Sequence, residues 1–79
     1  MELSEQTYMN ARDAYEYARR IGHRVHGLEH IIRQNPYWAR TYAIDVIGGR
    51  WPIAEGIIIS QGSAFIQNSY WAMVNGTVT

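Results

Sequence analysis

A short sequence unit recurs along the chain at intervals of about 25 residues. Alanine recurs at this spacing, and so do residues that commonly cap helix N-termini: Ala14, Ala39 and Ala64, and Asn10, Asn35 and Ser60. A one-residue insertion then changes the spacing to 26 and relates a second set of residues: Arg24, Glu29, Ile31 and Ile32 to Arg50, Glu55, Ile57 and Ile58. A duplicated unit of this length predicts a helical-repeat fold, because one unit is too small to bury its own apolar face.

The second unit has the pattern of a helical hairpin. Asn35 is placed to cap a helix that begins at Pro36, and Gly48-Gly49 would end that helix. Its apolar residues follow at three- and four-residue spacings: Trp38, Ala39, Tyr42, Ala43, Val46 and Ile47. Pro52 would begin a second, shorter helix. The β-branched residues 57–59 would also suit a strand, but the repeat and the preceding Trp51-Pro52 favour a helix.

The length of 79 residues fits one domain, because two domains would each be too small to sustain a core. We therefore predict an all-α, single-domain fold of two and a half stacked hairpins: repeat 1 at about 10–34, repeat 2 at 35–59 and a half repeat at 60–75. The five predicted helices lie near residues 4–21, 26–34, 36–47, 52–60 and 63–75. The predicted core consists of Tyr15, Ala18, Ile21, Leu28, Ile32, Ala39, Tyr42, Ala43, Val46, Ile57, Ile58, Ile66, Tyr70 and Met73.

The second unit resembles a short α-helical repeat of uncharacterised bacteriophage and large-virus proteins. The resemblance rests on Tyr42-Ala43, Val46-Ile47, Gly49-Arg50-Trp51-Pro52, Ala54-Glu55 and Ile58. It covers residues 36–58, whereas residues 11–32 have Val25-His26 in place of the Trp-Pro step and the third copy keeps only its opening helix. The resemblance implies stacked helical hairpins and a phage origin, and it implies no catalytic residue.

An arginine and a glutamate, five residues apart, recur in the two complete units as Arg24 and Glu29, and as Arg50 and Glu55. The arginine precedes the short helix and the glutamate lies in its first turns, where negative charge complements the helix dipole. Such an arginine can hold either the glutamate or the last carbonyls of the preceding helix. Repetition favours a structural clamp; the alternative is an anion site formed by Arg24 and Arg50.

The residues give little support to catalysis or to metal binding. His26 and His30 are one helical turn apart and are a weak candidate pair of metal ligands, with His23 and Glu29 nearby. The cluster crosses a predicted helix break and does not recur in the second unit, so we expect ordinary histidines there. The chain has no cysteine, no nucleophile elbow and no phosphate loop. We expect a protein without enzymatic activity and without a cofactor.

The charge of the chain favours a protein partner over nucleic acid. The formal net charge is +0, which argues against a protein that binds nucleic acid through bulk electrostatics. The candidate partner-binding residues are Arg12, Arg19, Arg20 and Arg24, but Asp13 and Glu16 lie in the same stretch. Nucleic acid therefore stays an alternative to a protein partner. The isoleucine run at residues 57–59 is far too short to cross a membrane, and the acidic N-terminus does not resemble a secretory signal, so we expect a cytoplasmic protein.

The last 24 residues, 56–79, contain no charged side chain. Their apolar side chains fall on more than one side of a helix, which predicts a homodimer interface at Phe65, Ile66, Tyr70, Trp71 and Val74. The alternative is that the first helix covers this surface within one chain. The predicted function is a non-enzymatic, phage-type protein-binding module, with inhibition of a host defence enzyme (an anti-CRISPR or anti-restriction role) in the bacterial cytoplasm as its sharpest form. A small nucleic-acid-binding protein and a phage assembly subunit are the alternatives.

Overall fold

The computed structural model describes residues 10–76, and within that range every regular element is a helix, which confirms the predicted all-α class. The predicted start of the first helix at residue 4 lies outside the described residues. The elements, in order, are α2 (Ala11–Ile21), η1 (His26–Leu28), α3 (Glu29–Ile32), α4 (Pro36–Tyr42), η2 (Ala43–Ile47), α5 (Pro52–Gln61) and α6 (Ala64–Gly76). η1 is a 3₁₀ turn, and η2 is a π-helical continuation of α4.

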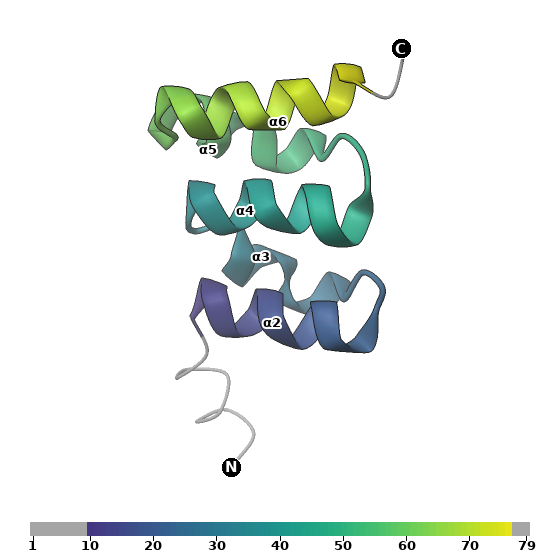
Figure 1. The fold of residues 1–79 in the computed structure, drawn as a ribbon. Helices are drawn as coiled ribbons and strands as arrows, with labels where there is room; N and C mark the ends of the chain where they lie inside the picture. Colours follow the sequence, from purple (N-terminus) through teal and green to yellow (C-terminus); the bar gives the residue numbers. More distant parts are fainter. Residues whose placement is uncertain (1–9, 77–79) are drawn as a thin grey trace.

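The helices form two layers (Figure 1). Helices α2, α4 (continued by η2) and α6 lie side by side in one layer, and helices α3 and α5 lie behind the spaces between them. Helix α4 is central, because it contacts α2 and α3 of the preceding hairpin as well as α5 and α6. Neighbouring hairpins therefore bury each other's apolar faces, as a stack of small units requires. None of the described helices is both long and apolar enough to cross a membrane.

Side-chain caps fix where the longer helices begin. The Oδ1 atom of Asn10 accepts the N–H of Asp13 at 2.8 Å, and that of Asn35 accepts the N–H of Tyr37 at 2.9 Å. The third cap, predicted at Ser60, was placed wrongly, because Ser60 lies inside α5. The hydroxyl of Ser63 instead accepts the N–H of Ile66 at 3.3 Å. The second unit is longer than the first because α5 continues to Gln61, so the two intervals between caps are 25 and 28 residues.

The one-residue insertion in the second unit is absorbed as a π turn. At the end of α2, the N–H of Gly22 bonds to the carbonyl of Ala18 at 2.9 Å, an ordinary four-residue step. At the equivalent place in the second unit, the N–H of Gly48 bonds to the carbonyl of Ala43 at 2.7 Å, which is a five-residue step. Both glycines have left-handed backbones, with φ of 93° and 75°. The extra residue thus widens one helical turn, and the first helix of each hairpin still ends at a glycine.

The core runs through the whole stack. Its largest fully buried side chains come from both layers: Trp51, Tyr42, Tyr70, Ile32 and Ile58. Ile21, predicted as a core residue, is 41% exposed. Its equivalent, eleven residues after the second cap, is Val46, which packs against the core. The difference arises because α4 has described helices on both sides, whereas α2 has them on one side only.

Candidate functional site

The two Arg–Glu pairs are clamps that each hold a tyrosine from the next unit. Arg24 donates from Nε and Nη2 to the two carboxylate oxygens of Glu29, at 2.9 and 3.0 Å. Tyr42, from α4, donates its hydroxyl to Oε2 of Glu29 at 2.8 Å. The same hydroxyl accepts the N–H of Val25 at 3.1 Å, in the turn before η1. One phenol therefore joins α4 to both the turn and the short helix of the preceding hairpin.

The second clamp has the same geometry. Arg50 donates to the two oxygens of Glu55 at 2.8 and 2.9 Å, and Tyr70 donates to Oε2 of Glu55 at 2.7 Å. The N–H of Trp51 bonds to the Tyr70 hydroxyl at 2.8 Å. Tyr70 is fully buried, so this residue of the predicted homodimer interface lies inside the stack. Arg24 and Arg50 each use Nε and Nη2 to hold a glutamate, an arrangement that favours the structural clamp over the anion site.

The clamps shift the ionisation of their members. Burial alone would raise the pKa of Glu29, but hydrogen bonds from Arg24 and Tyr42 outweigh it, and the pKa of Glu29 lies below its ordinary value of 4.5. The hydrogen bond from Arg50 likewise lowers the pKa of Glu55. Burial, together with the hydrogen bond to Glu29, raises the pKa of Tyr42 to about 12. Each clamp is therefore most stable with a charged carboxylate and a neutral phenol.

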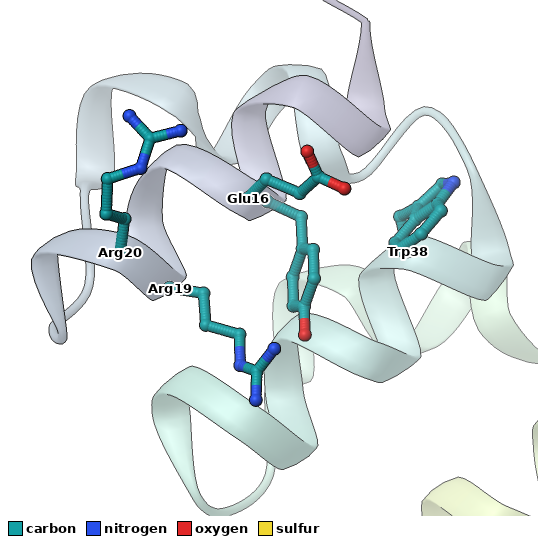
Figure 2. A pocket seen from close by; sticks show the side chains of 5 residues that line it. Glu16, Arg19, Arg20 and Trp38 are labelled. Carbon is teal, nitrogen blue, oxygen red and sulfur yellow. The ribbon is translucent and has the colours of Figure 1, made fainter.

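A shallow groove between α2 and α4 is one concave surface of the described residues (Figure 2). It encloses about 550 Å³ and is lined by Tyr15, Glu16, Arg19, Arg20 and Trp38. A second hollow of about 310 Å³ is lined by Asn10, Ala11, Arg12, Asn35 and Trp38. Because Trp38 lines both hollows, its indole separates two halves of one surface. We call the surface formed by the nine residues that line these two hollows the Trp38 groove.

The floor of the Trp38 groove is rigid. The rings of Tyr15 and Trp38 pack with their centroids 5.2 Å apart, and Trp38 also meets Tyr37 edge-on at 4.7 Å. The Tyr15 hydroxyl donates to Oδ2 of Asp45 at 2.6 Å. Burial, with this hydrogen bond, raises the pKa of Tyr15 to about 12, so the phenol stays neutral. An aromatic floor held in this way offers a preformed contact surface to a ligand.

Charges of both signs line the walls of the Trp38 groove. Arg12 lies 3.7 Å from Asp13 and 3.9 Å from Glu16, as weak pairs between exposed side chains. Neither Arg19 nor Arg20 forms an ion pair with any side chain in residues 10–76. The predicted partner-binding set is therefore divided by the fold: Arg12, Arg19 and Arg20 line the groove, whereas Arg24 belongs to a clamp.

The remaining predicted site residues lie apart from the groove. In α6, Phe65 is 69% exposed, whereas Ile66, Trp71 and Val74 are partly buried against the core. The guanidinium of Arg40 lies over the rings of Tyr37 and Phe65, 4.8 and 5.4 Å from their centroids. We call these three residues the Phe65 cluster.

The predicted metal candidates His26 and His30 are exposed, and Nδ1 of His23 is hydrogen-bonded to the carbonyl of Arg24 at 2.8 Å. Across residues 10–76, no three histidine, cysteine, aspartate or glutamate side chains are grouped so as to hold a metal ion.

Two features of the site were missed at the sequence level. The spacing identified the Arg–Glu pairs but not the tyrosines that complete them, although a tyrosine lies seven residues after each cap that the structure contains. The groove role of Trp38 was also missed, because its place in the apolar stripe predicts a core residue. Comparison of the chain with protein-family models, curated proteins and solved structures finds no match.

Proposed function

We propose that this chain is a non-enzymatic protein-binding module, and that the Trp38 groove holds a short segment of a partner protein that carries both acidic and basic side chains. The observation that carries the proposal is the placement of Arg19 and Arg20, without ion pairs to described residues, beside the packed rings of Tyr15 and Trp38. A carboxylate of the partner would bind the arginines, and an apolar or planar side chain would lie on the indole.

The mixed charge of the groove supports a protein partner over nucleic acid. Glu16 lies among the groove arginines, and Asp13 lies within reach of Arg12. Carboxylates in these places would repel a phosphate backbone, whereas a protein segment with both kinds of charge can satisfy them. A rigid aromatic floor with an arginine rim is also the composition typical of protein-interface centres.

The test is capture of a partner from bacterial lysate by the chain and by matched charge reversals. Arg19→Glu and Arg20→Glu should each reduce the captured partner by at least about tenfold, because a favourable contact becomes a repulsive one. Arg33→Glu is the control, since Arg33 does not line the groove. Equal capture by all three variants would contradict the proposal. Anisotropy with a labelled single-stranded oligonucleotide should show no binding at 150 mM salt; groove-dependent binding there would favour the nucleic-acid alternative.

The Phe65 cluster supports a second interaction, the homodimer through α6. An aromatic ring that is 69% exposed, on a helix without charged side chains, is the kind of surface that protein contacts cover. With Tyr70 inside the stack, the proposed contact centres on Phe65 and Tyr37 and extends to the exposed parts of Ile66, Trp71 and Val74.

The phage-type role remains part of the proposal. The sequence resemblance to phage and large-virus repeats is its only support, and it places the module in the host bacterial cytoplasm as an inhibitor of a defence enzyme or as an assembly subunit. Identification of the captured partner separates these roles: a host nuclease or surveillance complex would indicate an inhibitor, and virion proteins would indicate assembly.

A further inference from the structure

A tyrosine lies seven residues after each helix cap, at Tyr17, Tyr42 and Tyr70, which follow Asn10, Asn35 and Ser63. The last two tyrosines place their hydroxyls in the clamps of the preceding units. Tyr17 occupies the same position on α2, yet its side chain is 42% exposed and its hydroxyl has no hydrogen-bond partner in residues 10–76. Tyr17 therefore has the position of a clamp tyrosine, but no Arg–Glu pair among the described residues binds its hydroxyl.

The residues around Tyr17 match those around Tyr42. The small residues that flank the position are the same in the first two units, since Ala14 and Ala18 correspond to Ala39 and Ala43, and all four are fully buried. One turn further along, Ile21 is 41% exposed where its counterpart Val46 packs against the core. Tyr17 and Ile21 therefore occupy on α2 the positions that Tyr42 and Val46 occupy on α4 and η2, where Tyr42 is bonded to the preceding hairpin.

We infer that the side of α2 with Tyr17 and Ile21 is a docking surface for a helical hairpin of a different protein. The hairpin would present an arginine and, five residues later, a glutamate, and these would hold the Tyr17 hydroxyl as Arg24 and Glu29 hold Tyr42. A second copy of this chain does not fit the requirement, because both of its clamps are already filled by its own Tyr42 and Tyr70. This surface is separate from the Trp38 groove, which lies between α2 and α4.

The first test uses the full chain and compares three single substitutions. Tyr42→Phe and Tyr70→Phe should each increase the equilibrium constant of unfolding by about tenfold or more, because each leaves a clamp carboxylate and a backbone N–H short of a partner. Tyr17→Phe should change it by less than about twofold, since the hydroxyl has no hydrogen-bond partner among residues 10–76. A loss for Tyr17→Phe as large as that for Tyr42→Phe would overturn the inference, because the hydroxyl would then already be held within the chain.

The second test supplies a clamp of known structure. The chain's own hairpin, residues 35–62, is joined directly before Asn10 of residues 10–79, so that its Gly62 precedes Asn10 as it normally precedes Ser63. In this fusion, Tyr17→Phe should increase the equilibrium constant of unfolding about tenfold. When the added hairpin also carries Glu55→Gln, the effect of Tyr17→Phe on that constant should be much smaller. If Tyr17→Phe leaves the unfolding constant of the folded fusion unchanged, the inference is overturned.

Two further measurements test whether the Tyr17 hydroxyl is bound in the fusion and whether a second copy of the chain binds it. The hydroxyl proton of Tyr17 should exchange slowly in the fusion, as that of Tyr70 should in both proteins, and fast exchange would count against docking. Sedimentation of the full chain gives the remaining check: self-association abolished by Tyr17→Phe would show that a second copy is the occupant and would overturn the assignment to a different protein. Neither measurement involves Arg19, Arg20 or Trp38, so failure here leaves the groove proposal standing.

Discussion

The hydroxyl of Tyr70 donates to Glu55 at 2.7 Å and so ties α6 to the helix before it. The same contact between Tyr42 and Glu29 ties α4 to α3. Because the phenol comes from one hairpin and the carboxylate from the previous one, these bonds lie between units. They also set the register of the stack, since each hydroxyl accepts a backbone N–H from the turn, at Val25 or Trp51. A buried polar network of this kind specifies one arrangement of helices where apolar packing alone would allow sliding.

The clamp tyrosines should matter more for stability than exposed ones. Tyr70→Phe keeps the ring but removes a buried hydroxyl bonded to a charged group, which should cost about 1.5–3 kcal/mol of unfolding free energy. Tyr37→Phe is the matched control, because Tyr37 is 43% exposed and its hydroxyl is not needed by a clamp. Urea denaturation followed by circular dichroism measures both. A Tyr70→Phe variant as stable as the Tyr37→Phe variant would show that the clamp is dispensable.

Acid should weaken the fold through the clamp carboxylates. The pKa of Glu29 is lower in the folded chain than its ordinary value of 4.5, so its stabilisation is present above pH 4.5 and is lost as the pH falls through the folded pKa. The melting temperature should therefore decline below about pH 4.5. Glu29→Gln should reduce stability at neutral pH and flatten this decline, whereas Glu16→Gln, on the surface, should leave the decline unchanged. An unaltered acid profile in Glu29→Gln would contradict the assignment.

Alkaline pH should destabilise the fold by ionising the buried tyrosines. Burial raises the pKa of Tyr15 and of Tyr42 to about 12, in each case with help from a hydrogen-bonded carboxylate, and burial raises the pKa of Tyr70 as well. These neutral phenols stabilise the fold fully below the tyrosine pKa of about 10 in the unfolded chain, and the stabilisation is lost as the pH rises toward 12. Absorbance at the phenolate band should show part of the six tyrosines ionising late, and all of them near pH 10 in denaturant. A single transition near pH 10 in the folded chain would contradict burial of these phenols.

Much of the fold was predictable from the sequence, and the reasons are local. Asn35, Pro36 and the glycines at 48 and 49 mark the ends of one helix through capping and backbone preference, so its bounds followed from the residues. The third unit was harder. Sequence spacing alone suggested Ser60 as its cap, but nothing local distinguishes Ser60 from Ser63, and the choice depends on how far α5 extends under α6.

The candidate site was less predictable, because it depends on contacts between units. Arg24 and Glu29 are close in sequence, so their pairing could be anticipated, whereas Tyr42 reaches Glu29 only after two hairpins have stacked. The exposure of Ile21 illustrates the same limit. Its position in the helical stripe indicates a buried residue, and the presence or absence of a neighbouring helix decides the outcome.

Gly56 within α5 and Gly62 just after it should respond in opposite ways to substitution by alanine. A Cβ at Gly62 would collide with the carbonyl oxygen of Ile58, at the turn into α6, so Gly62→Ala should destabilise the chain by about 1–3 kcal/mol. A Cβ at Gly56 meets no atom within 4 Å, and alanine is the better helix former, so Gly56→Ala should stabilise it by about 0.5–1 kcal/mol. Thermal denaturation of the pair provides the comparison. If both variants shift in the same direction, the turn geometry at Gly62 is not as described.

The proposed homodimer gives the last prediction. Phe65 is 69% exposed and packs only against the guanidinium of Arg40 within the Phe65 cluster, so pairing of two α6 helices would bury it. Light scattering should report about twice the 9.1 kDa of one chain at micromolar concentration. Phe65→Glu should return the chain to the monomer, because it would place two carboxylates in the contact, whereas Ile53→Glu on α5, at an even more exposed position, should leave the dimer intact. A 9.1 kDa species in the unmodified chain would exclude the dimer, and a dimer that persists in Phe65→Glu would place the contact on another surface.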